Sequence, residues 1–349
     1  MAIACKKCFQ TLRECFILTS SRVIASAPAN TMLMGEHAVL FGHSALVCAL
    51  TQRIYVQANK RADDLIVVDS QLGHFSYPLA DLEAQLHESS QFSFVLQAIV
   101  LCDLDTGLHL VIESDFEHTL GLGSSAAVTV ATLGAIELLF KRQFDTQAVM
   151  RLGIESIRKV QGRGSGADIA ASALGGIVEF QAKPISAHKV SLSTQTWQCA
   201  PSLRLVYCGY KTPTPVVIEQ VHQAAAREPK RFTQLYEQMG VCVKASMHAL
   251  NNEDWPTFAE YMNQYQNLMR ELGVSDKVIE NIIELGRTQV KTDALFGAKI
   301  SGSGLGDCVL LLGSEPLHWP HTQMSVQIDS QGLRQENHLP SQTLYEKKS

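Results

Sequence analysis

The chain has 349 residues and a mass of 38.3 kDa, enough for one large domain or two of ordinary size. It is 46% hydrophobic and 18% charged, the balance of an ordinary soluble globular protein. A formal net charge of −5 and a pI of about 6.2 argue against nucleic acid or an anionic membrane as partner, because both favour a basic surface.

Residues 1–20 are predicted to be an extension that the fold does not need. The short apolar run from Cys15 to Leu18, followed by Ala25-Ser26-Ala27, resembles a signal peptide with its cleavage site. However, Arg22 interrupts the apolar stretch, and no apolar run reaches the roughly 20 residues of a membrane span. The nine cysteines are odd in number and scattered, which is typical of buried thiols in a reducing compartment. We therefore expect a cytoplasmic protein.

The first part of the chain is predicted to be rich in strands. One strand begins at Val23, and Ile54 and Val56 alternate with polar neighbours in the pattern of a half-buried strand. The other elements expected before residue 120 are strands over 65–68 and 108–113 and helices near 78–88 and 92–103.

A glycine- and serine-rich loop begins at Gly121 and leads into a run from Val128 to Phe140 with apolar residues at helical spacing. Glycine allows a tight turn and a close approach to a ligand. The start of a helix offers free N–H groups and the positive end of the helix dipole to a phosphate. From the local sequence, the loop is either a phosphate-binding loop or a plain Gly-Ser loop that begins a core helix.

The rest of the chain is predicted to be mainly helical. A helix over about 145–160 and a strand over 177–181 precede Lys183 to Pro201, whose composition is typical of a linker. A strand from Leu203 to Tyr207 follows, and an amphipathic helix ends near Leu272, its tyrosines and methionines explained most simply as core packing. The stretch Lys211 to Pro215 is better explained as a plain Pro-Thr linker than as a substrate-side loop.

A third loop, Ser301-Gly302-Ser303-Gly304, leads into an apolar strand from Val309 to Leu312. Together the chain carries, in order, Gly-Glu-His, Gly-Leu-Gly-Ser-Ser and Lys-Ile-Ser-Gly-Ser-Gly-Leu-Gly. This ordered set resembles the GHMP small-molecule kinases, named after galactokinase, homoserine kinase, mevalonate kinase and phosphomevalonate kinase. The resemblance covers residues 23 to about 330. Within the family, Gly-Glu-His-Ala-Val-Leu-Phe-Gly at 35–42 looks most like the mevalonate kinases.

The resemblance implies an α+β protein with two domains and a cleft between them for ATP and substrate. Residues 21–190 would form the ATP-binding N-terminal domain, similar to domain 2 of ribosomal protein S5, with a left-handed crossover. Residues 200–335 would form a ferredoxin-like C-terminal domain. The implied function is ATP-dependent phosphorylation of the 5-hydroxyl of mevalonate in isoprenoid biosynthesis, with Mg²⁺ as cofactor. Homodimers occur in this family, so a homodimer is one expectation, whereas nucleic acid and membranes are not expected partners.

The family pattern also assigns roles to residues. Asp168 takes the place of the catalytic aspartate that accepts or orients the proton of the acceptor hydroxyl, although the local sequence alone favours a helix N-cap. Glu36 and His37 take the place of a substrate-facing pair, and a structural histidine is the alternative for His37. Ser125 would bind Mg²⁺, and Ser301 would also contact substrate. The implied ATP-binding residues are Gly121, Leu122, Gly123, Ser124, Ser125, Ala126, Ser301, Gly302 and Ser303.

The chain also departs from the family pattern. Asn30 stands where the family has a lysine, so it is assigned a catalytic place without the positive charge. The magnesium-binding glutamate would fall at Ile157, and Glu155 lies on a different helix face. Glu117 and Thr119 replace a proline and a glycine before the second loop. Lys299 is expected either at the cleft edge or in solvent.

These departures keep other functions open. One alternative is another GHMP kinase, acting on phosphomevalonate, on the 3-hydroxyl of mevalonate or on a sugar. The other is a non-catalytic relative that binds ATP or a metabolite and acts as a sensor. The substitutions at Asn30 and Ile157 favour these alternatives, whereas the retained Asp168 favours an enzyme.

Overall fold

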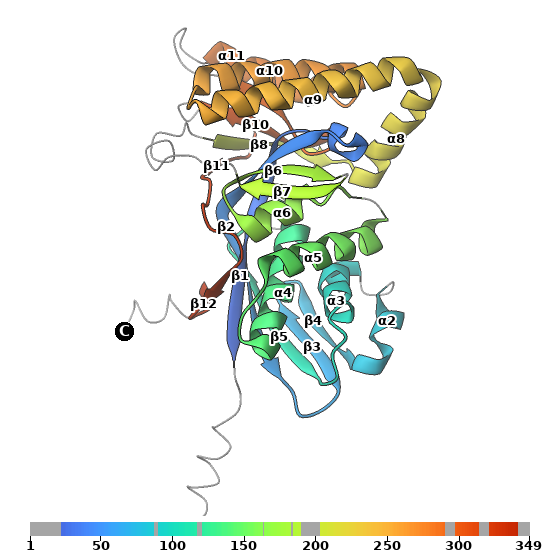
Figure 1. The fold of residues 1–349 in the computed structure, drawn as a ribbon, viewed down its shortest axis with the longest axis vertical. Coiled ribbons are helices and arrows are strands. Elements are labelled where there is room, and N and C mark those ends of the chain that lie inside the picture. Colours follow the sequence, from blue (N-terminus) through green and yellow to red (C-terminus); the bar gives the residue numbers. More distant parts are fainter. Residues whose placement is uncertain are drawn as a thin grey trace, which may run out of the picture.

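The computed structural model describes residues 22–86, 90–116, 121–162, 164–182, 184–189, 203–289, 297–313 and 321–340. The predicted extension at 1–20, the residues Glu117 and Thr119, and most of the predicted linker lie outside these ranges. The described residues build two β-sheets with helices packed against each (Figure 1).

The first sheet has the strand order β12-β1-β2-β5-β3-β4, with β6 paired to β2 and β7 paired to β6. All pairs are antiparallel except β3 with β5. Its strands are β1 (Val23–Met34), β2 (Ser44–Lys60), β3 (Leu65–Ser70), β4 (Gly73–Pro78), β5 (Leu108–Ser114), β6 (Ile177–Ala182), β7 (Ile185–Lys189) and β12 (Arg334–Glu336). Strand β7 falls inside the stretch that was predicted to be a linker.

Helix α4 (Ser124–Lys141) packs on β1 and β2 and is surrounded by three further helices of this domain. Among the described residues it is the one helix long and apolar enough to cross a membrane, but 72% of it is buried inside the protein. Its apolar character is therefore explained by its place at the centre of the core. The surrounding helices are α3 (Ser93–Val100), α5 (Thr146–Gln161) and α6 (Ala167–Leu174).

The second sheet is antiparallel with the order β11-β8-β10-β9. Helix α10 packs on β9, and α11 contacts three of the strands. The elements of this half are β8 (Leu203–Lys211), α8 (Thr214–Arg227), α9 (Pro229–Asn251), α10 (Trp255–Leu272), α11 (Lys277–Gln289), β9 (Gly297–Ser301), β10 (Gly306–Leu312) and β11 (Gln323–Val326). The combination of two sheets and packed helices confirms the predicted α+β class.

The two halves are joined both by packing and by the path of the chain. Helix α9 packs against β2, and α10 contacts β1. After β11 the chain returns to the first sheet, where β12 pairs with β1, as Figure 1 shows at the blue strand. Arg53 on β2 is 1% exposed and binds this returning segment through Asp329, at 2.6 Å, and through the carbonyl of Gly332. The last residues of the range predicted for the C-terminal domain thus complete the N-terminal sheet.

Most predicted elements have counterparts in the structure, but one predicted helix differs from the observed element. The helix predicted near 78–88 is a 3-10 turn, Leu79–Asp81, followed by the single-turn helix α2 (Leu82–Gln85). Leu82 is its one buried residue, so too little apolar surface is covered to support a longer helix. The tyrosine and methionine stripe of α10 is buried as expected: Tyr265 and Met269 are both 0% exposed.

Candidate active site

The second of the three glycine-rich loops begins at Gly121 and leads into α4, whose N-terminus is open. Gly121 and Gly123 have φ values of 67° and 65°, a backbone that L side chains rarely adopt. Gly123 is the N-cap of α4, where no side chain caps the helix and no acidic residue occupies the first turn. The first N–H groups of α4 are therefore available to an anion. This geometry favours a phosphate-binding loop over a plain helix start.

Asn30 on β1 holds this loop in place. Its backbone N–H donates to the carbonyl of Leu122 at 3.0 Å, and its side-chain Nδ2 donates to Oγ of Ser172 at 3.0 Å. A Cβ on Gly123 would lie 2.4 Å from the Asn30 amide, so only glycine fits there. The pairing of β1 with β2 is irregular between Pro28 and Asn30, as expected where a strand re-aims a side chain. Asn30 thus positions the glycine-rich loop, and its predicted catalytic role stays a prediction.

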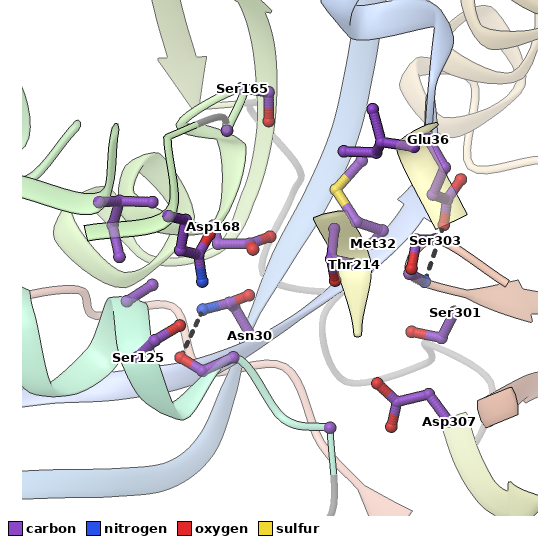
Figure 2. A pocket seen from close by; sticks show the side chains of 18 of the residues that line it. Asn30, Met32, Glu36, Ser125, Ser165, Asp168, Thr214, Ser301, Ser303 and Asp307 are labelled. Carbon is purple, nitrogen blue, oxygen red and sulfur yellow. Dashed lines mark hydrogen bonds between the residues drawn. The ribbon is translucent and has the colours of Figure 1, made fainter. Parts of the chain in front are cut away.

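A cavity of about 400 Å³ lies in front of the loop and is lined by residues of both halves. Figure 2 shows Ser125 and Asp168 on one side of it and Ser301, Ser303 and Asp307 on the other. The structure brings all the predicted site residues to this cavity or its wall, apart from Leu122, which is buried behind the loop. The first and third predicted loops therefore meet the second loop in space.

Asp168 lies in the first turn of α6, and its side chain opens onto the cavity. Desolvation in the cavity wall and, to a smaller extent, the nearby charge of Glu36 together raise its pKa to about 6, against the opposing charge of Lys211. A carboxyl group with a pKa close to neutral is suited to accept a proton from a substrate hydroxyl. The N-cap of α6 is Gly166, so the alternative of Asp168 as a helix N-cap is wrong.

Glu36 forms a buried ion pair with Lys299. The Lys299 ammonium lies 2.5 Å from Oε1 of Glu36, and the two side chains are 0% and 3% exposed. The expectation that Lys299 reaches the cleft edge or solvent is wrong, because β9 carries it into the core beneath the cavity. Burial raises the pKa of Glu36 and lowers that of Lys299, since both charges lose water. Oε2 of Glu36 is buried without a hydrogen-bond partner among the described residues. It can accept a hydrogen bond from a ligand in the cavity.

The sequence pattern gave no sign that Tyr265 supports this pair. Its hydroxyl donates to the backbone carbonyl of Glu36 at 2.9 Å, and its ring faces the Lys299 ammonium at 5.9 Å. The position of this tyrosine in an amphipathic helix predicts core packing. The hydrogen bond of its hydroxyl depends on the packing of α10 against β1, which the sequence pattern does not give.

His37 is held in one orientation. Its Nε2 lies 2.8 Å from the carbonyl of Ser303, and because a carbonyl only accepts, Nε2 carries the proton. Burial lowers the His37 pKa, so the ring is neutral near pH 7 and its Nδ1 is an acceptor. Its φ of 61° is unusual for a residue with a side chain, a strain that is common at functional sites. The contact also joins the first predicted loop to the third.

The third loop is bound to β1 by a second contact. Oγ of Ser301 lies 2.6 Å from Oγ1 of Thr31, and both hydroxyls are buried. Gly302 and Ser303 line the cavity beside it. These contacts hold the two halves of the site together.

The metal-binding part of the family pattern is only partly present. Ile157 lines the cavity and offers no ligand, while Glu155 is 52% exposed and pairs with Lys159 at 3.4 Å, so it does not replace the family glutamate. No group of three or more metal-binding side chains is found among the described residues. Mg²⁺ in nucleotide sites, however, usually takes one or two protein ligands, with phosphates and water as the rest. Ser125, which lines the cavity, fits that requirement as one such protein ligand.

The stretch from Lys211 to Pro215 is not a plain linker, contrary to expectation. It joins β8 to α8, and Lys211, Pro213, Thr214 and Pro215 all line the cavity. The Thr212 hydroxyl donates to the carbonyl of Leu305 at 2.6 Å, which fixes the stretch to the third loop. Composition alone could not distinguish this segment from a linker, because its role depends on packing against β10.

A second cavity of about 920 Å³ adjoins the first at the start of α4. It shares Ser124 and Ser125 with the first cavity, and most of its lining is apolar, including Phe92, Val95 and Val128. Apolar walls with a few polar groups are typical of small-ligand sites. Sequence reasoning did not find these residues, since they come from scattered elements with no shared motif.

Family models match three parts of the chain. The description "GHMP kinases N terminal domain" matches residues 92–176, "GHMP kinases C terminal" matches 246–318, and "Galactokinase galactose-binding signature" matches 13–60. The first two contain the second and third loops, and the last contains Glu36 and His37.

Curated relatives and solved structures agree with these matches. The mevalonate kinase of Thermococcus onnurineus is 29% identical over 91% of this chain and 100% of its own length. That of Pyrococcus furiosus is 30% identical over 83% and 89%. In structure, the mevalonate kinase of Methanococcus jannaschii superposes with a TM-score of 0.74 at 20% identity, covering 88% of this chain and 98% of that one. The galactokinase of Lactococcus lactis, solved with galactose, reaches 0.74 at 17% identity over 94% and 99%.

Proposed function

The chain belongs to the GHMP kinase family, and we propose that it transfers the terminal phosphoryl group of ATP to the 5-hydroxyl of mevalonate. The observation that carries the proposal is the match to curated mevalonate kinases over nearly the whole chain. The cavity supports it, because Asp168, Glu36 and the open N-terminus of α4 face one space that is large enough for an acceptor and phosphates.

The nucleotide has a natural place across the glycine loop. We infer that its adenosine occupies the apolar second cavity and that its phosphates reach the first cavity past Ser124 and Ser125, which line both. The N–H groups at the start of α4 then bind phosphate oxygens. Ser125 would hold Mg²⁺, which would neutralise phosphate charge when bound.

The acceptor lies between the nucleotide and the Gly-Glu-His loop. Glu36 and neutral His37 offer hydrogen-bond acceptors to its hydroxyl groups, and Asp168 takes the proton of the attacking hydroxyl. His37 and Ser301 also connect the two halves, so the acceptor is enclosed by both and held away from water.

A sugar kinase is the second candidate. The galactose-binding signature covers the segment with Glu36 and His37, and the galactokinase fold superposes well on this one. The same carboxylate and imidazole could bind the hydroxyls of a sugar as well as those of a hydroxy acid.

An ADP-release assay with Mg²⁺ and ATP tests the choice of acceptor. We expect turnover with mevalonate and at most background rates with galactose, homoserine and phosphomevalonate, and ³¹P and ¹³C NMR should locate the new phosphate on the 5-carbon of the product. Turnover with galactose instead would support the sugar kinase. Tight ATP binding without turnover on any acceptor would support the sensor.

We further propose that the protein works in the cytoplasm. Cys48, Cys102, Cys208 and Cys242 form no disulfide, and burial raises the thiol pKa of Cys48 and Cys102 to about 12. Protonated thiols that form no disulfide support a reducing compartment. Cell fractionation with an antibody against the chain tests this, and recovery from an extracytoplasmic fraction would contradict it.

A further inference from the structure

The first cavity has a marked imbalance of charge. Three carboxylates line it, those of Glu36, Asp168 and Asp307, whereas Lys211 is the one lysine or arginine among its described lining residues. His37 adds no positive charge near pH 7, because burial lowers its pKa. A triphosphate brings several further negative charges, which phosphoryl transfer requires the site to neutralise.

Lys299 does not supply that charge. Its side chain is 0% exposed, and its ammonium is bound to Oε1 of Glu36 and to the carbonyl of Ile300. Reaching a phosphate would leave Glu36 ionised and unpaired in the core, which is strongly unfavourable. Lys211, by contrast, has a side chain that is 45% exposed and opens onto the cavity.

Lys211 is held next to the phosphate-binding loop by Asp307. Its ammonium lies 2.9 Å from Oδ2 of Asp307. The carboxylate of Asp307 lies against Gly121, where an added Cβ would come within 1.9 Å of Oδ1. That Oδ1 is shielded from solvent and has no hydrogen-bond partner among the described residues. The ion pair thus reaches from the second sheet to the first residue of the glycine loop.

The Lys211 ammonium can exchange the Asp307 carboxylate for a phosphate oxygen. Both partners retain access to solvent, and partly exposed ion pairs are weak because water competes for the charges. A phosphate oxygen forms a strong charge-assisted hydrogen bond with an ammonium group. The Lys211 charge also acts on Asp168, where it opposes the rise in pKa, so the ammonium stands within electrostatic reach of the proposed reacting centre.

We propose that Lys211 is a catalytic residue that binds the terminal phosphate of the nucleotide and neutralises it during transfer, and that Asp307 is a positioning residue that holds the ammonium until the nucleotide arrives. The inference rests on the proposed function for the identity of the nucleotide, but not for that of the acceptor. It gives the site a cation from β8, whereas Asn30, which takes the place of the family lysine, lies on β1.

Equilibrium binding of Mg-AMPPNP and of Mg-ADP to the full chain tests the proposal. AMPPNP carries the terminal phosphate and ADP lacks it. Lys211→Met should weaken AMPPNP binding by about tenfold or more, the loss expected for a hydrogen bond between charged groups, and leave ADP binding within about twofold. Lys211→Arg should retain most of the affinity. Lys244→Met, at an exposed lysine of α9 outside the cavity, is the matched control and should change neither.

Asp307→Asn gives an independent readout. Removing the carboxylate that competes for Lys211 should tighten AMPPNP binding by about twofold to fivefold, whereas weaker AMPPNP binding would contradict the exchange of Asp307 for phosphate. In steady-state assays Lys211→Met should lower kcat by roughly 100-fold to 1000-fold. This is the usual loss when one hydrogen-bond donor to the charge that develops in a transition state is removed.

Failure of the two proposals can be told apart, since the binding assay contains no acceptor. If mevalonate is not turned over but Lys211→Met still loses AMPPNP selectively, the acceptor is wrong and the Lys211 proposal stands. Equal losses for AMPPNP and ADP, or no loss for either, overturn the Lys211 proposal whatever the acceptor.

Discussion

At the scale of single residues, the site depends on carboxyl groups whose surroundings set their proton affinity. Asp168 opens onto the cavity and has a pKa of about 6, whereas Glu36 is enclosed and neutralised by Lys299. Two carboxyl groups in one cavity therefore have different tasks. Asp168 can exchange a proton with substrate, and Glu36 can bind a hydroxyl without leaving its partner.

The first prediction concerns pH. Asp168 accepts a proton only when ionised, so kcat/KM, which reports the ionisation of the free enzyme, should fall as pH drops through about 6, where its carboxyl group becomes protonated. A profile of kcat/KM between about pH 4.5 and about pH 8 measures this limb, with unfolding monitored by circular dichroism at each pH. A value of kcat/KM that stays constant down to about pH 4.5 would contradict a proton acceptor with a pKa of about 6.

The second prediction concerns the buried ion pair. Lys299→Met leaves the Glu36 carboxylate without its partner in the core, and this should lower the free energy of unfolding by about 3–5 kcal/mol. Urea denaturation measures the loss. Adding Glu36→Gln should recover part of it, because the unpaired charge is then gone. A single variant within about 1 kcal/mol of wild type would show that Glu36 takes up a proton at little cost.

At the scale of elements, three loops become one site because each is bound to a neighbour. Asn30 binds the second loop, His37 binds the third, and Thr31 binds Ser301. All three anchors lie on β1 or immediately after it, so this strand and the turn that follows it organise the site. The phosphate loop is therefore held in shape before any ligand binds.

The third prediction compares two glycines that both have a positive φ. Gly123 and Gly162 have φ values of 65° and 69°, but a Cβ on Gly123 would meet the Asn30 amide at 2.4 Å, whereas one on Gly162 would meet nothing within 4 Å. Gly162→Ala should carry only the backbone strain, about 1–2 kcal/mol. Gly123→Ala should carry the same strain and also displace Asn30, so it alone should weaken AMPPNP binding, by about tenfold or more. Equal AMPPNP affinities in the two variants would argue against an anchoring role for Asn30.

The fourth prediction concerns the segment that returns to the first sheet. Arg53 donates to Ser26, Asp329, Gln331 and Gly332 from a buried position. Arg53→Lys keeps the charge but cannot form this fork of bonds, so it should cost about 2–4 kcal/mol of unfolding free energy in a urea titration. Arg61→Lys, at an exposed pair with Asp63, is the control and should have no measurable effect. A similar result for both variants would show that the returning segment contributes little to stability.

At the scale of the whole molecule, the sequence predicts the parts that follow local rules. The three glycine-rich loops, the helix after Ser124 and the amphipathic helix ending at Leu272 carry their own periodicity or turn residues, and each was found where expected. Their meeting in one cavity was expected from the family resemblance and is confirmed by the geometry.

What the sequence did not predict depends on long-range packing. Lysine is usually exposed, so the residue type of Lys299 gives no sign of its burial. The pairing of β9 with β10 and the contact of Lys299 with Glu36 explain that burial. The role of Lys211 depends on the charge balance of a cavity that both halves build. Likewise β12 is three residues long, and nothing local marks it as a partner of a strand some 300 positions earlier.

The most direct test of the account follows phosphoryl transfer from ATP to mevalonate by wild type and by Asp168→Asn, with AMPPNP affinity measured for both. We expect wild type to form 5-phosphomevalonate and the variant to lose at least about 100-fold in kcat while it binds AMPPNP as wild type does. A variant that turns over at the wild-type rate, or a wild-type chain that phosphorylates a different acceptor in preference to mevalonate, would contradict the account.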